Sequence, residues 1–349
     1  MPDTNKLIRS LILIFLACGA LYFAKTFLVP IAFGSMLAML LIPICQWLEN
    51  KGIGQALSAI ACILLFVVLV SGVVVLLSWQ VAGIADDAEQ IIVQINKIPA
   101  SVQQYIDRTL GFSVEKQKVF MKEQSSSFTL KAGDKIALAA GSTVVLIGKS
   151  MLVVIYTFLF IYYRRHLGSF VLKFVPAKDM ELAERIMLSI SQVAQKYISG
   201  LGIMIGVLWI MYGIGFSIIG IKHALFFAIL CGLLEIVPYV GNLTGSLITA
   251  VMAFTQGGSN MALWVLAVYG VVQFTQTYLL EPLIVGAKVS INPLCTIAVI
   301  ITGEMLWGIS GMVLAIPLLG TVKIICDNIP SLQPYGFLIG EVKSRKKKA

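Results

Sequence analysis

Apolar runs of about 20 residues are the feature that most constrains how this chain can fold. Crossing a hydrocarbon layer of about 30 Å takes about 20 residues of helix at 1.5 Å each. The chain is 58% hydrophobic and only 12% charged, whereas a soluble domain is about 45–50% apolar and about 25% charged. The sequence therefore predicts an all-α membrane protein. The runs of spanning length are Leu7–Ala24, Phe27–Leu48, Ala56–Trp79, Thr143–Tyr163, Leu201–Gly220 and Met261–Leu280.

Two longer apolar stretches are interrupted near the middle. His223–Thr255 is broken at Pro238–Asn242, and Pro293–Cys326 is broken at Trp307–Gly311. An unbroken helix of about 33 residues would measure about 50 Å, well beyond the hydrocarbon layer. Each stretch therefore predicts a re-entrant hairpin of two half-length helices.

The span at Met261–Leu280 separates the two hairpins and reverses the direction of the second. The expected fold is about six full transmembrane helices plus two re-entrant helical hairpins, which form an inverted repeat with both tips near the midplane. Paired interruptions of this kind are typical of the binding sites of secondary transporters. The alternative fold has eight transmembrane helices, with each interrupted stretch a single kinked and tilted span.

The distribution of Lys and Arg predicts the orientation. With the N-terminus inside, basic residues gather in inside segments such as Arg164–Arg165 and Lys343–Lys348, and the short outside loops hold only Lys25 and Lys222. We therefore expect a multi-pass protein of the cell inner membrane with both termini cytoplasmic.

This topology divides the chain into five regions. Apolar residues recur at helical spacing between Val81 and Ile98, and again in the basic stretch Ala177–Ser199, so both segments are expected to be amphipathic helices. The expected regions are three N-terminal transmembrane helices forming a scaffold (1–80), an extracytoplasmic amphipathic helical insertion (81–142), a fourth transmembrane helix with a cytoplasmic amphipathic helix (143–200), an inverted-repeat transport region (201–330) and a basic cytoplasmic tail (331–349).

Two glutamates hold matched positions beside the breaks. Glu235 lies three residues before Pro238, and Glu304 lies three residues before Trp307. A carboxylate within a membrane is costly, so each is a candidate to bind a coupling proton or cation. The alternative is a structural glutamate, protonated or capped, that ties the hairpin tip to a neighbour.

Other polar residues near the breaks complete the candidate site. Asn242 and Ser310 could contact a solute or cap a half-helix, and Gln273 and Gln276, one turn apart, could line a polar path or join helices. Glu281 could instead anchor its span at the interface. The candidate substrate-binding residues are Glu235, Pro238, Tyr239, Gly241, Asn242, Gln273, Gln276, Glu281, Glu304, Trp307, Gly308, Ser310 and Gly311.

Motifs of other protein classes are missing. The two histidines, His166 and His223, belong to no HExxH motif, and the cysteines form no CxxC pair. We therefore expect that the protein is not an enzyme and that it binds no cofactor and no metal. Gly148-Lys149-Ser150 lacks the earlier glycine of a phosphate-binding loop, so active transport would be driven by a gradient. The net charge of +9 follows no basic groove pattern, and we expect no nucleic-acid partner.

The residues around the breaks carry a family resemblance. The matching segments are Pro238–Gly241, Glu281-Pro282 with Val285-Gly286, and Leu306–Gly311 running into Ala315–Pro317. On these segments the chain resembles the autoinducer-2 exporter (AI-2E) family of membrane transporters.

The resemblance implies an exporter of small signalling molecules of quorum sensing, such as autoinducer-2, a neutral polyhydroxylated compound. It also implies a homo-oligomer, a pentamer, in which the hairpins move against a fixed scaffold in an elevator-like manner. Sodium/proton antiport, credited to other relatives, is the alternative. A membrane scaffold without transport is the second alternative.

Overall fold

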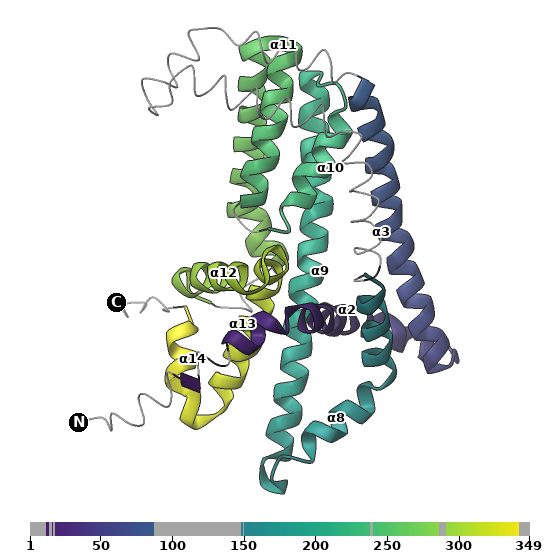
Figure 1. Cartoon of the computed structure of the whole chain (residues 1–349), viewed down its shortest axis with the longest axis vertical. Helices are drawn as coiled ribbons and strands as arrows, with labels where there is room; N and C mark the ends of the chain where they lie inside the picture. Colours follow the sequence, from purple (N-terminus) through teal and green to yellow (C-terminus); the bar gives the residue numbers. More distant parts are fainter. Residues whose placement is uncertain are drawn as a thin grey trace, which may run out of the picture.

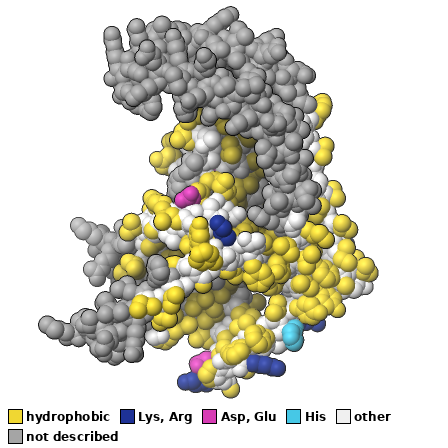
Figure 2. Space-filling view, in the orientation of Figure 1, with side chains coloured by type: hydrophobic (Ala, Val, Ile, Leu, Met, Phe, Trp, Pro, Cys, Tyr) yellow, Lys and Arg dark blue, Asp and Glu magenta, His cyan; other side chains and the backbone are white. Residues whose placement is uncertain are grey.

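The computed structural model describes residues 12, 13, 16, 18–86, 148, 150–237, 240–285 and 291–341. These residues are helical apart from short turns and one isolated bridge between Ile291 and Gly340. Five helices among them are long and apolar enough to cross a membrane. Figure 2 shows hydrophobic side chains over most of the described surface on one face, where few charged groups appear. The predicted all-α membrane fold is confirmed.

Helix α9 (Met180–Ile219) is the column around which the others pack (Figure 1). Met204, Leu208, Tyr212 and Phe216 recur every fourth residue and are all buried, so they form one stripe along the helix. This stripe packs against α10 (Ala224–Leu234) and α11 (Val240–Thr275). Helix α3 (Gln55–Asp86) lies on the opposite side of α9 from α11 in the view of Figure 1.

The continuity of α9 corrects one expectation. The amphipathic stretch Ala177–Ser199 and the span Leu201–Gly220 were expected to be separate elements. After a short 3-10 turn, η1 (Ala177–Asp179), they form one helix of 40 residues that ends at Gly220 in the left-handed conformation. Gly200 is buried, and such tertiary packing overrides the low helix propensity of glycine.

The N-terminal segment bends where a loop was expected. Lys25 was expected to separate two spans, but helix precedes and follows Ala24, whose φ of −82° and ψ of 5° bend the chain without reversing it. Trp307 Nε1 donates a hydrogen bond of 3.0 Å to the Leu21 carbonyl beside this bend, and a side chain bonded to a helix carbonyl is a common cause of a kink. That residues 7–24 form a separate span stays a prediction, since residues 1–11 lie outside the described part.

Helix α2 (Lys25–Asn50) connects the bend to the rest of the fold. It packs with α3 and the helix Ser150–Tyr162 around a second buried cluster that includes Cys45, Cys62 and Ile161. At its end, Arg164 at the start of α8 (Arg164–Leu172) donates two hydrogen bonds to Glu49, of 3.0 and 2.5 Å. The predicted insertion at 81–142 lies largely outside the described residues, as do residues 342–349 of the basic tail.

The first interrupted stretch is a helical hairpin. Its arms are α10 and the first part of α11, and a Cβ on Gly245 would lie only 3.0 Å from Cα of Cys231 on the facing arm. At the open end, the Lys222 N–H donates to Gln256 Oε1 at 2.8 Å. The two arms therefore touch both along their length and at their open end, which excludes the alternative of a single kinked helix. The break begins at Glu235, slightly earlier than expected, and Pro238 and Tyr239 lie outside the described residues.

The span that follows this hairpin is separated from its second arm by two glycines. Gly257 and Gly258 (φ 70°, ψ −161°) leave the helical conformation inside α11. The chain turns back there, because Asn242 near the start of α11 bonds Gln273 near its end. The helix then widens into a π-helix, η2 (Gln276–Val285).

The second interrupted stretch is a tighter hairpin of α12 (Pro293–Trp307) and α13 (Ile309–Asn328). Only Gly308 leaves the helix, with φ 63° and ψ −145°, a conformation that suits glycine. The arms approach so closely that a Cβ on Gly303 would lie 2.5 Å from the Gly311 carbonyl oxygen. The expected break at Trp307–Gly311 is thus a single residue.

The end of the chain folds back on this hairpin. Asn292 caps α12 by accepting from Cys295 N at 2.7 Å. After η3 (Pro330–Leu332), α14 (Gln333–Ile339) returns along α13, and Asn292 Nδ2 donates to the Leu338 carbonyl at 2.6 Å. How the two hairpins enter the bilayer stays a prediction.

Candidate functional site

A chain of hydrogen-bonded polar side chains lies at the tip of the first hairpin. Gln276 Nε2 donates to Glu235 Oε1 at 2.6 Å. Asn242 Nδ2 donates to Gln276 Oε1 at 3.3 Å and to Gln273 Oε1 at 2.5 Å. The Tyr212 hydroxyl donates to Asn242 Oδ1 at 2.7 Å. We call Glu235, Gln276, Asn242, Gln273 and Tyr212 the first-tip network.

The network connects three parts of the fold within an apolar core. Tyr212 comes from α9, Glu235 and Asn242 flank the break of the hairpin, and Gln273 and Gln276 lie where α11 becomes η2. Tyr212, Gln276 and Asn242 are at most 3% exposed. A buried polar group must be hydrogen-bonded to be tolerated, so these contacts fix the relative positions of the three parts.

Local backbone geometry places these side chains. A Cβ on Gly241 would fall 1.6 Å from the Leu234 carbonyl oxygen, so only glycine lets the first turn of α11 come this close to the end of α10. That approach places Asn242 and Glu235 where Gln276 bonds both. The π-helix begins at Gln276, and such wide turns are frequent at functional sites.

Two atoms beside the network have unused bonding capacity. Glu235 Oε2 and Ser246 Oγ are buried and have no hydrogen-bond partner in the described part of the chain. Leaving such an atom unpaired costs about 1–3 kcal/mol, so each is suited to bind a solute group. Glu281 is exposed and lies in the π-helix that begins at Gln276.

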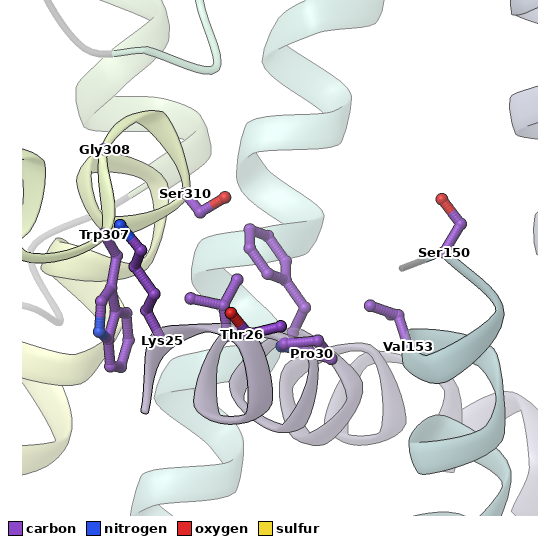
Figure 3. A pocket seen from close by; sticks show the side chains of 10 residues that line it. Lys25, Thr26, Pro30, Ser150, Val153, Trp307, Gly308 and Ser310 are labelled. Carbon is purple, nitrogen blue, oxygen red and sulfur yellow. The ribbon is translucent and has the colours of Figure 1, made fainter. Parts of the chain in front are cut away.

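The second tip lies in different surroundings. Glu304 is exposed on α12, because its neighbour Gly303 is the residue that faces α13. Trp307, Gly308 and Ser310 line a cavity of about 410 Å³ with residues of α2 and of the helix Ser150–Tyr162 (Figure 3). Gly311 is buried against Gly303. The two glutamates are matched in sequence, but their surroundings differ.

The structure therefore gathers part of the expected set. It brings together Glu235, Gly241, Asn242, Gln273 and Gln276, with Glu281 nearby. Tyr212 was missed by sequence reasoning, because a tyrosine in an apolar run at helical spacing has the pattern of a core residue. The described residues contain no group of three or more His, Cys, Asp or Glu that could hold a metal ion.

Apolar helices of spanning length, helical hairpins and a buried polar network at a hairpin tip together define a multi-pass membrane transporter. The sequence profile described as AI-2E family transporter matches residues 11–331, so the chain belongs to this family. YrrI of Bacillus subtilis is 23% identical over 308 residues, 86% of each chain. YueF of the same organism is 25% identical over 345 residues, 94% of this chain and 93% of its own length. Both are named as candidate transport proteins.

Proposed function

We propose that the protein is a secondary transporter that exports a small polar solute across the inner membrane, and that the first-tip network is its binding site. The observation that carries the proposal is the buried chain of amide, phenol and carboxylate groups at the break of a hairpin. Broken helices at matched positions are where secondary transporters bind their substrates. Glu235 Oε2 and Ser246 Oγ add free capacity at the same place.

The chemistry of the network favours a neutral solute with several hydroxyl groups. Asn242, Gln273 and Gln276 each offer both donors and acceptors, and Tyr212 adds a hydroxyl. Glu235 is the only carboxyl group within the network. Autoinducer-2, the substrate class of the family resemblance, has this character, and we propose it as the solute.

Movement of whole hairpins is the proposed transport step. The arms of each hairpin are in close backbone contact, at Gly241 with Leu234 and at Gly303 with Gly311. Each hairpin can therefore move as one unit against α2, α3 and α9 in an elevator-like manner. In the proposed assembly, a homo-oligomer holds the scaffold fixed.

An exchange of sodium for protons is the second candidate function. It is favoured by two acidic residues near this tip, Glu235 in the network and Glu281 in the same π-helix as Gln276. Neighbouring carboxylates suit a proton or a hard cation, and either ion could also be the coupling ion of solute export.

Flux in liposomes tests these functions. Purified protein is reconstituted, a proton or sodium gradient is imposed, and movement of autoinducer-2 and of the ions is followed separately. Solute flux that depends on a gradient supports the exporter. Ion exchange without organic solute supports the antiporter. Absence of every flux from correctly assembled protein would leave a scaffold role.

A further inference from the structure

The cavity at the second tip is separate from the first-tip network. Its ten lining residues come from α2, from Ser150 and Val153, and from the tip of the second hairpin at Trp307, Gly308 and Ser310. Its volume of about 410 Å³ is in the range of pockets that hold small molecules. Both a scaffold helix and a hairpin tip therefore contribute to its walls.

The charge in this cavity is positive. Lys25 is the one ionisable side chain among the ten described residues that line the cavity, and none of these ten carries a carboxylate. Its ammonium lies 4.6 Å from the centre of the Tyr22 ring, a cation–π contact that holds the side chain in place. Figure 3 shows the side chain extending from α2 so that its end lies beside Trp307.

Hydroxyl groups also line this cavity. Thr26, Ser150 and Ser310 line the cavity, and each hydroxyl can donate and accept a hydrogen bond. The Trp307 indole already donates to the Leu21 carbonyl, so Lys25 and the hydroxyls are the groups available to a ligand. A cation with nearby donors is the arrangement that binds carboxylate and phosphate groups.

The first-tip network differs from this cavity in the charge of the ligand that it favours. The acidic groups at the first tip are Glu235 in the network and Glu281 in η2, and an ionised carboxylate there would disfavour an anion. We propose that the second-tip cavity is an anion site that binds a small carboxylate- or phosphate-bearing molecule, with Lys25 as its charged contact. Because α2 and the hairpin tip both line the cavity, a bound anion restrains the second hairpin against α2.

Binding to purified full-length protein tests this site through Trp307. The signal is the difference in tryptophan fluorescence between the protein and its Trp307→Phe variant, titrated with inorganic phosphate, malonate and, as a neutral probe, glycerol. We expect a saturable change with phosphate and malonate and none with glycerol. Lys25→Gln should weaken binding at least about tenfold, the loss of one charge-assisted hydrogen bond, whereas Lys25→Arg should largely preserve it.

Lys51→Gln is the matched control. Lys51 lies just after the other end of α2 and stacks on Trp47 at 3.6 Å, away from the cavity, so this variant should bind like the unchanged protein. Equal losses in Lys25→Gln and Lys51→Gln, or no saturable signal at all, would overturn the site. Glu235→Gln should leave anion binding unchanged, so the result is independent of the transport proposal.

The anionic group could come from a soluble molecule or from a lipid headgroup. Titrations in phosphatidylcholine nanodiscs, with and without phosphatidylglycerol, separate these sources. A soluble ligand predicts the same phosphate affinity in both. A headgroup ligand predicts that phosphatidylglycerol changes the Trp307 signal and competes with phosphate, and that Lys25→Gln removes both effects. Persistence of these effects in Lys25→Gln would contradict the assignment of Lys25.

Discussion

Gln276 Nε2 donates a hydrogen bond of 2.6 Å to Oε1 of Glu235, which lies 41 residues earlier in the chain. This bond ties the tip of the first hairpin to the start of the π-helix. Moving the tip away from η2 must break it, together with the bonds of Asn242 to Gln273 and Gln276. Each is worth about 0.5–1.5 kcal/mol net, so a bound solute or proton could supply enough differential free energy to shift the hairpin between two positions.

Replacing Glu235 by Gln should uncouple solute flux from the pH gradient. The amide keeps the shape and hydrogen-bonding capacity of the side chain but cannot titrate, so assembly should largely survive. Gradient-driven flux in liposomes is the measurement, and size-exclusion chromatography reports assembly. Glu304→Gln is the matched control, because Glu304 is exposed and outside the network. Unchanged gradient dependence in Glu235→Gln, or lost assembly, would favour a structural glutamate.

Tyr212→Phe should weaken the network at its contact with α9. The change removes the hydroxyl that donates to Asn242 Oδ1 at 2.7 Å and leaves a buried acceptor without its partner. We expect a loss of about 1–3 kcal/mol in the free energy of unfolding, measured by denaturation in detergent, and weaker solute binding. Tyr278→Phe, at a tyrosine that is 70% exposed, should change neither quantity. Equal stability of the two variants would show that the Tyr212 bond is not used.

The hairpins could be predicted from the sequence because their signals are local. Apolar length and the interruptions at Pro238–Asn242 and Trp307–Gly311 report directly on backbone geometry. The fusion that forms α9 and the bend at Ala24 were not predictable in this way. Both depend on packing against residues far away in sequence, such as the contact of Trp307 with Leu21.

The candidate site could be predicted only in part for a similar reason. Polar residues in apolar runs identified Glu235, Asn242, Gln273 and Gln276, since their cost in a membrane is independent of the fold. Sequence position alone could not show that Glu235 lies in the network whereas Glu304 is exposed. Which face of a helix is buried depends on the helices that pack against it. Sequence reasoning likewise used Lys25 only to predict the orientation of the chain, and could not show that it lines a cavity.

Gly303→Ala should destabilise the second hairpin. The added Cβ would lie 2.5 Å from the Gly311 carbonyl oxygen, and a backbone atom cannot move aside without separating the arms. Overpacking of this kind costs about 1–3 kcal/mol, and thermal denaturation of the purified protein would measure it. Gly206→Ala in α9, where a Cβ would meet nothing within 4 Å, should be neutral or stabilising. A neutral Gly303→Ala would show that the arms are farther apart than described.

Reporter fusions should place residues 118 and 178 in opposite compartments. The basic asymmetry predicts that the insertion at 81–142 is extracytoplasmic and that Arg164–Ser199 is cytoplasmic. The bidentate pair of Arg164 with Glu49 adds a structural constraint, because it holds the end of α2 and the start of α8 on the same side. A fusion after Lys51 should therefore report the same compartment as one after Lys178, and a fusion after Lys118 the other. Matching signals at Lys118 and Lys178 would reverse the predicted topology, whereas opposite signals at Lys51 and Lys178 would contradict the contact between α2 and α8.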